Sequence, residues 1–263
     1  MSVVATVEEW SRVAELGPFF VTSLQAERED DAADPSWASL TTLVEDPAVL
    51  ASRIAQTREA LAAAAQRRPE EVEWRIAASI AHLGLAARFV APLMGLAVTT
   101  GKVAPVGLAQ ASWRPILGGP YPLYFTESRH TPDSGEHASA ETQLAAPPST
   151  SDIPTISRLF ATEILDGPVR QLTEAVLRSG SIASGLLWGN VVSGVGGAAK
   201  MIQMARPSLS TQATLFVDEL LRHEPLLATA MRRENGQLQR RSCCLMYRLP
   251  GAGYCGDCSF SAI

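Results

Sequence analysis

Four cysteines are the residues of this sequence best suited to chemistry, and all of them lie within its last 21 positions. If cysteines were placed at random, the chance of such clustering would be roughly a few in 100,000, so a shared site is expected. The four are Cys243, Cys244, Cys255 and Cys258. Four thiolates are the ligand set of a tetrahedral zinc ion or of a small iron–sulfur cluster.

The spacing of the cysteines bears on which of these two centres is present. Neighbouring side chains of an extended strand point to opposite faces, so Cys243 and Cys244 converge only if the backbone turns there. A single zinc ion tolerates an adjacent pair poorly, whereas a two-iron cluster is wider and offers two acceptors. Between the pair and the later C-x-x-C half, Pro250, Gly251 and Gly253 supply the chain reversal that brings the halves together.

The segment RRSCCLMYRLPGAGYCGDCSF, residues 240–260, resembles the C-terminal signature of the FhuF-type ferric-siderophore reductases, whose motif is C-C-x10-C-x2-C. A second likeness is SGLLWGNVVSG, Ser184–Gly194, which is similar to the Trp-Gly-Asn helix of that family. The resemblance implies a 2Fe-2S cluster held by the four cysteines. It also implies one-electron reduction of ferric iron inside an imported siderophore, in the cytoplasm.

Outer-sphere transfer of one electron forms no bond to the substrate. No catalytic nucleophile or general base is therefore expected beyond the cluster. A cluster with four thiolates carries negative charge, which grows on reduction, and nearby cations and hydrogen bonds must offset it. Arg240, Arg241 and Arg248 flank the cysteines. Of these, Arg241 and Arg248 are candidate substrate-binding residues, because an arginine can attract an anionic ferric siderophore.

Two alternatives remain open from the sequence alone. The first is a binding module in which the four cysteines hold a structural zinc ion. The second is an electron carrier that acts on a partner other than a siderophore. A 2Fe-2S protein is red-brown and bleaches on reduction, whereas a zinc protein is colourless, so colour separates the first alternative from the cluster.

Composition predicts a globular, mainly α protein with a minor β element (an α+β fold). The resemblance implies that this helical domain ends in a C-terminal iron–sulfur loop. Hydrophobic residues make up 46% and charged residues 19%, while only 6% are aromatic. The formal net charge of −5 argues against a nucleic-acid partner. Residues 200–263 differ from the rest, with eight basic and five acidic residues, and could steer an acidic ligand towards the C-terminal segment.

Helix-start signals and one long apolar run organise the first half. Thr6 with Glu9 predicts a capping box, and Asp46 with Pro47 predicts an N-cap followed by proline at the first helical position. Residues 76–100 are long and apolar enough to span a bilayer.

That apolar run contains His82, Arg88 and Pro92, which favours a buried core helix. No stable membrane insertion is therefore expected. The first residues lack the pattern of a secretory signal, so we expect a cytoplasmic protein.

Two sub-domains are predicted on either side of a polar, proline-rich stretch. Residues 1–130 form the N-terminal, mainly helical one, and 150–263 the C-terminal, FhuF-like one with the cluster segment 240–260. The expected smaller elements are a short hairpin in 106–128, a linker at 129–152, helices at 153–165, 168–178, 181–204 and 210–233 (bent or broken at Pro225), and a strand-like run at 239–250.

Gly194, Gly196 and Ala199 mimic the spacing of a dinucleotide-binding fingerprint. That fingerprint must follow a strand, and the residues before Gly194 instead look helical, which favours small-residue helix packing. With no convincing nucleotide site, electrons are expected from an external donor such as a ferredoxin or a flavin reductase.

Overall fold

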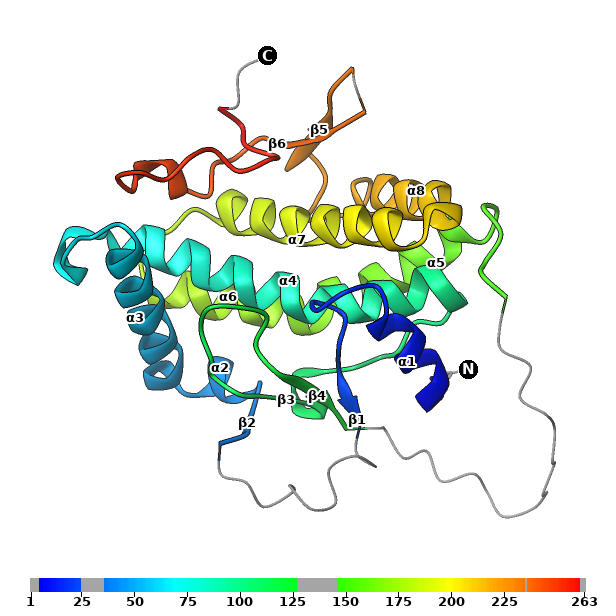
Figure 1. The fold of residues 1–263 in the computed structure, drawn as a ribbon, viewed down its shortest axis with the longest axis horizontal. Helices are drawn as coiled ribbons and strands as arrows, with labels where there is room; N and C mark the ends of the chain where they lie inside the picture. Colours follow the sequence, from blue (N-terminus) through cyan, green and yellow to red (C-terminus); the bar gives the residue numbers. More distant parts are fainter. Residues whose placement is uncertain (1–4, 25–35, 127–145, 235, 261–263) are drawn as a thin grey trace.

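The computed structural model describes residues 5–24, 36–126, 146–234 and 236–260 (Figure 1). The helices are α1 Val7–Ala14, α2 Thr42–Glu45, α3 Pro47–Ala64, α4 Trp74–Thr100, α5 Ile153–Phe160, α6 Arg170–Ser179, α7 Ser184–Ala205 and α8 Ser210–Leu220. The strands are β1 Ser23–Leu24, β2 Ala38–Ser39, β3 Ala111–Trp113, β4 Leu123–Phe125, β5 Ala230–Arg232 and β6 Leu238–Arg240. Short 3-10 turns are η2 Pro69–Glu71, η3 Leu108–Gln110, η5 Pro207–Leu209 and η6 Met246–Arg248, and η4 Ala161–Val169 is a π-helical segment. The described residues are 58% helical with small sheets, which confirms the predicted mainly α fold.

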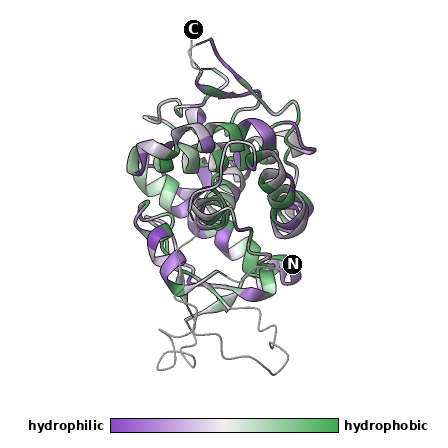
Figure 2. Ribbon diagram, turned by 90° about the vertical axis from the view of Figure 1, so that its right-hand side faces the viewer, coloured by the Kyte–Doolittle hydropathy of each residue, from purple (hydrophilic) through white to green (hydrophobic). Residues whose placement is uncertain are grey.

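Helix α4 is the centre of the core, and α7 packs along it more extensively than any other element. In Figure 2 apolar residues run through these central helices. By length and composition α4 could cross a membrane, but 78% of its most apolar stretch is buried within the protein. Gly194 makes the close approach possible, since a Cβ there would lie 2.9 Å from Ala87 Cα. The predicted small-residue helix packing of this motif is thus confirmed.

His82 and Arg88, the two polar residues of the apolar run, are buried and have hydrogen-bond partners. His82 is fully buried, and its Nε2 lies 3.0 Å from Thr173 Oγ1. Burial lowers the pKa of His82 to about 3, so the ring is neutral. The guanidinium of Arg88 donates to the carbonyls of Tyr121 (2.8 Å), Phe19 (3.0 Å) and Val21.

The start signals of two helices are confirmed. Thr6 and Glu9 form a capping box at the start of α1. Asp46 accepts a hydrogen bond from the backbone N–H of Ala48 at the start of α3, with Pro47 as the first helical residue.

The larger sheet has the strand order β1-β4-β3-β2. Strands β3 and β4 are antiparallel, with Trp113 opposite Leu123, which confirms the hairpin predicted in 106–128. Strand β1 pairs parallel with β4, and β2 pairs antiparallel with β3.

The second half contains the predicted helices with two differences. The helices predicted at 153–165 and 168–178 are joined by the π-helical segment η4, in which Gly167 departs from helical geometry just before Pro168. The helix predicted for 210–233 ends at Leu220, before Pro225, and residues 230–232 instead pair with 238–240 as the β5–β6 hairpin. The break expected at Pro225 is confirmed, since proline cannot continue the helical hydrogen bonds, but the helix predicted for the residues that follow it was wrong.

The strand-like run predicted at 239–250 was also largely wrong. Strand β6 ends at Arg240, and a 3-10 turn covers Met246–Arg248. Leu245 has a positive φ of 68°, so the chain turns directly after the adjacent cysteines.

The division into two sub-domains stays a prediction. The predicted linker at 129–152 lies mostly outside the described residues. On either side of it, residues of both predicted sub-domains, such as Phe89 and Val191, belong to the same buried core cluster.

Candidate metal centre

The adjacent cysteines lie in a turned segment that follows β6 (Figure 1). The positive φ of Leu245 redirects the chain, and the Leu245 backbone N–H donates to Cys243 Sγ at 3.2 Å. The next reversal occurs at Gly251, whose φ is also positive (78°). The expectation that the backbone must turn at the cysteine pair is confirmed.

Cys244 and Cys255 bring the two halves of the motif together, with their sulfurs 3.7 Å apart. Two thiolates that are each about 2.3 Å from one tetrahedral metal are separated by about 3.8 Å, so this pair has the spacing of two ligands on one metal. Cys244 is buried and Cys255 is half-buried, and neither is in a disulfide.

Cys243 and Cys258 complete the sulfur set. The Cys258 backbone N–H donates to the Cys255 carbonyl at 3.0 Å, which forms the turn of the C-x-x-C half. Burial, followed by the nearby Cys244 and Cys258 thiols, raises the pKa of Cys243. Within the described residues no group of three potential ligands is placed to hold one metal ion.

The short distance between Cys244 and Cys255 shifts the pKa values of their two thiols in opposite directions. The hydrogen bond from the Cys255 thiol, together with Arg240, lowers the pKa of Cys244 to about 5 despite burial. The same hydrogen bond, followed by burial, raises the pKa of Cys255. A thiolate is the form that ligates a metal, so the surroundings of Cys244 favour the ligating state.

Arg240 is the cation in direct contact with the sulfurs. Its side chain is 1% exposed, and its Nη2 donates to Cys255 Sγ at 2.7 Å. Nη1 donates to Asn190 Oδ1 at 3.0 Å, and Nε lies 3.0 Å from Asp257 Oδ2. Burial lowers the pKa of Arg240, but Asp257 and the cysteines outweigh it and raise the pKa overall, so the guanidinium stays charged.

Helix α7 holds the cysteine segment in place through contacts of its Trp-Gly-Asn motif. Asn190 donates to Ser79 of α4, to the carbonyl at 2.9 Å and to Oγ at 3.1 Å, while its own oxygen accepts from Arg240. Gly189 allows a close approach, since a Cβ there would overlap with Ser242 Oγ. Ser242 instead donates to the Gly185 carbonyl at 2.9 Å.

One turn further along α7, Ser193 donates to Asp257 in the C-x-x-C loop. Asp257 thus joins α7 to Arg240, and the Arg240 backbone N–H also donates to the Asp257 carbonyl at 2.9 Å. An apolar groove of about 400 Å³ between α4 and α7 extends to Arg240 and Cys255.

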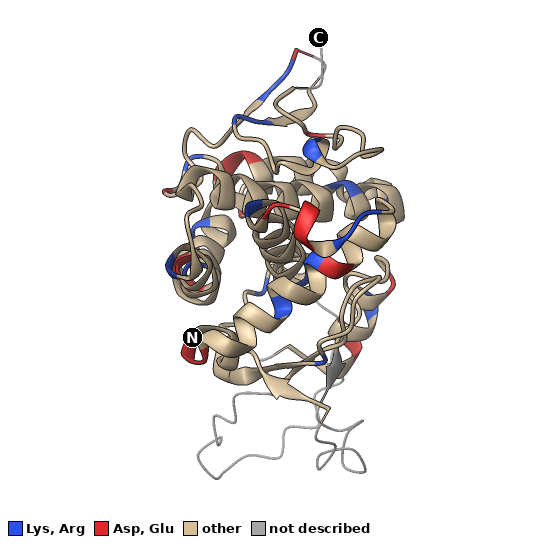
Figure 3. Cartoon of the chain, turned by 90° about the vertical axis from the view of Figure 1, so that its left-hand side faces the viewer, with Lys and Arg blue, Asp and Glu red and all other residues tan. Residues whose placement is uncertain are grey.

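The two arginines predicted to bind substrate lie on the exposed side of the segment. The Arg248 Nη2 is 2.7 Å from Glu73 Oε1, just before α4. Arg241 is exposed, and its backbone N–H donates to the Thr229 carbonyl at 2.8 Å. Their contact with substrate stays a prediction. In Figure 3 basic residues recur on the β5–β6 hairpin and the adjoining segment.

Sequence reasoning missed the two residues that tie the C-x-x-C loop to α7. Ser193 and Asp257 are 64 positions apart and neither belongs to a ligand motif. The available signal was that each lies inside a stretch already singled out, Ser193 in SGLLWGNVVSG and Asp257 in CGDC.

Comparison with known proteins supports the assignment of the cluster. Residues 240–258 match the family model of the FhuF 2Fe-2S C-terminal domain, which confirms the resemblance seen in the sequence. No curated protein matches the chain. The match and the four C-terminal cysteines identify the cofactor as a 2Fe-2S cluster.

Proposed function

We propose that this chain, with its FhuF-type 2Fe-2S domain, reduces Fe(III) held in ferric siderophores to Fe(II) in the cytoplasm. The observation that carries the proposal is the sulfur set of an iron–sulfur family motif with a buried arginine donating to one sulfur. When bound, the cluster supplies one-electron, outer-sphere reduction. The electron enters from an external donor, a ferredoxin or a flavin reductase, and leaves to the ferric chelate.

The ligands in this proposal are Cys243, Cys244, Cys255 and Cys258. The 3.7 Å between Cys244 and Cys255 supports their sharing one iron, which leaves Cys243 and Cys258 for the other. This arrangement separates the adjacent pair onto different irons, which removes the difficulty of aiming neighbouring side chains at one centre.

Arg240 offsets the negative charge of the thiolates. A hydrogen bond to a ligating sulfur from a charged donor favours the more negative, reduced state and raises the reduction potential. Asn190 and Asp257 hold the guanidinium in place from two sides. Arg241 and Arg248 are proposed to attract the chelate from the exposed side.

The experiment begins with protein purified anaerobically. We expect iron, acid-labile sulfide and an EPR signal that appears only on reduction. The reduced protein is then mixed with ferric hydroxamate and ferric catecholate siderophores in a stopped-flow instrument, with a ferrous-specific chelator present. The expected result is recovery of the visible absorbance together with formation of the ferrous complex.

Three results would contradict the proposal in different ways. Zinc without acid-labile sulfide, even after reconstitution, would identify a structural metal module. Rapid reoxidation by an oxidised ferredoxin but by no ferric chelate would identify an electron carrier. A cluster that no chelate and no ferredoxin reoxidises would exclude both redox functions.

A further inference from the structure

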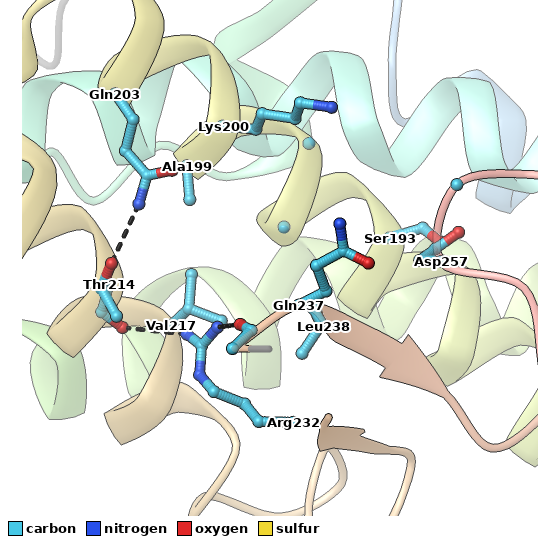
Figure 4. A pocket seen from close by; sticks show the side chains of 14 residues that line it. Ser193, Ala199, Lys200, Gln203, Thr214, Val217, Arg232, Gln237, Leu238 and Asp257 are labelled. Atoms are coloured by element: carbon cyan, nitrogen blue, oxygen red, sulfur yellow. Dashed lines mark hydrogen bonds between the residues drawn. The ribbon is translucent and has the colours of Figure 1, made fainter. Parts of the chain in front are cut away.

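A cavity of about 660 Å³ lies beside the cysteine segment, between α7, α8 and the β5–β6 hairpin (Figure 4). This volume is within the range of small-molecule sites, about 300–1,000 Å³. Helix α7 contributes Gly196, Gly197 and Lys200, and the C-x-x-C loop contributes Gly256 and Asp257. Since those last two residues lie between Cys255 and Cys258, any occupant contacts the loop that carries two of the ligands.

Small residues open this side of α7. A Cβ at Gly197 would meet nothing within 4 Å, so the surface of α7 at this position is open to the cavity. At Gly196 the absence of a side chain has a different role, because a Cβ would lie 2.6 Å from Leu238 Cδ2 of the hairpin. The hairpin therefore packs onto α7 at one glycine and leaves the cavity open at the next.

Polar groups of fixed orientation line the end of the cavity away from the cysteines. Gln203 of α7 donates to Thr214 Oγ1 of α8 at 2.9 Å. Arg232 of β5 donates to the Gly236 carbonyl at 2.8 Å and lies 2.5 Å from Asp218 Oδ1. In Figure 4 these side chains lie at one end, while Ser193 and Asp257 lie at the other.

The charges that line the cavity do not balance. Asp257 is its acidic residue, and this carboxylate is already engaged by Arg240 and Ser193. Arg232 is compensated by Asp218, but Lys200 is exposed and forms no ion pair within the described part of the chain. The cavity therefore presents an excess positive charge at its rim, next to hydrogen-bonding amides.

We propose that this cavity is the substrate site of the reductase function proposed above and that it takes an anionic, oxygen-rich ferric chelate. Lys200 binds the negative charge of the chelate, the polar end hydrogen-bonds its oxygen atoms, and Gly256 and Asp257 place its iron next to the cysteine loop. The proposal assigns recognition of the bound chelate to α7 and the hairpin. Arg241 and Arg248 do not line the cavity, so their proposed role is limited to attracting the chelate before it binds.

The test measures binding separately from reduction, by using gallium(III), which is not reduced under these conditions. A trianionic tris-catecholate chelate and a cationic trihydroxamate chelate of gallium are titrated calorimetrically into the cluster-loaded protein. We compare Gly197→Phe, which fills the cavity, and Lys200→Glu, which reverses its charge. The matched controls are Gly185→Phe, at another open glycine of α7, and Arg178→Glu, an exposed cation of α6 outside the cavity.

We expect the anionic chelate to bind more tightly than the cationic one, and both cavity variants to weaken it at least tenfold. The controls should stay within twofold of the parent, and all four variants should keep the visible spectrum. Binding that is unchanged in both cavity variants would overturn the site. If reduction of ferric chelates also continued at the parent rate, the proposed function would survive that failure. Conversely, binding that the cavity variants weaken, without any reduction of ferric chelates, would support the site and contradict the reductase function.

Discussion

The guanidinium of Arg240 lies 2.7 Å from Cys255 Sγ, and the Arg240 side chain is only 1% exposed. A buried cation is costly unless it is paired, and Arg240 is paired with Asp257 and with a sulfur. Charge compensation at the centre is therefore part of the folded core. It does not depend on flexible surface arginines, which solvent and salt would screen.

Replacing Arg240 with Gln should lower the midpoint potential of the cluster, because a charged hydrogen bond to a ligating sulfur is lost. An energy of ~1.4 kcal/mol corresponds to about 60 mV for one electron, so we expect a decrease of several tens of millivolts. A redox titration followed by visible absorbance measures it. Arg240→Lys should retain part of the parent value, and the exposed Arg241→Gln serves as the matched control. Equal potentials in the parent and Arg240→Gln would remove this role from Arg240.

Cys255→Ser should abolish or strongly shift the visible spectrum while the helical circular dichroism persists, because the helical core is built without this residue. Iron content should fall in the same variant. The neighbouring Tyr254→Phe, at an exposed ring, should leave both unchanged. A spectrum and iron content equal to those of the parent would exclude Cys255 from the ligand set.

In the parent, Gly189→Ala forces Ser242 to rotate away and lose its hydrogen bond to Gly185, which costs about 1 kcal/mol and offsets the gain of up to ~1 kcal/mol that alanine brings over glycine within a helix. In a Ser242→Gly background the obstacle is gone and only that gain remains. The same substitution should therefore be about 1 kcal/mol more favourable in the Ser242→Gly background than in the parent. Urea unfolding of the four proteins measures this, and an identical effect in both backgrounds would show that the two residues do not interact.

Acid should destabilise the protein through His82. Its pKa is lowered to about 3 in the folded protein, so the unfolded chain takes up a proton below about pH 6.5 that the folded chain does not. Stability is complete above pH 6.5 and is lost as the pH falls towards 3, by ~2 kcal/mol at pH 5. Urea unfolding at pH 7 and pH 5 measures the loss.

In His82→Gln, which keeps a polar group near Thr173, most of that pH dependence should disappear. The comparison uses the difference between the two pH values and not the absolute stability, since the substitution itself alters packing. An unchanged slope in the variant would assign the acid sensitivity to other groups.

The sequence alone predicted those features of the fold that depend on residues close together in the chain. The capping box of Thr6 and Glu9, the N-cap at Asp46 and the buried α4 all follow from neighbouring residues, and the structure confirms them. The clustered cysteines likewise predicted a metal centre, and the resemblance of their spacing to the FhuF motif predicted a 2Fe-2S cluster, which the family match supports.

Long-range contacts account for what the sequence could not provide. Arg240 was one of three flanking arginines in the sequence, and only its packing against Asn190, 50 positions earlier, distinguishes it from Arg241 and Arg248. The strand expected after Arg240 failed for a related reason. Its apolar and β-favouring residues fit a strand, but convergence of the cysteines requires the turn at Leu245.

Helix α7 contributes residues both to the contacts with the cysteine loop and to the proposed substrate cavity. Asn190 and Ser193 fix the cysteine loop, and Lys200 borders the cavity, ten residues or about 15 Å along the axis from Asn190. A helix is stiff, so its backbone keeps a constant separation between Lys200 and the residues that hold the cysteine loop. For a chelate bound as proposed, this separation would limit how far the electron must travel, and the potential of the chelate would then decide the rate.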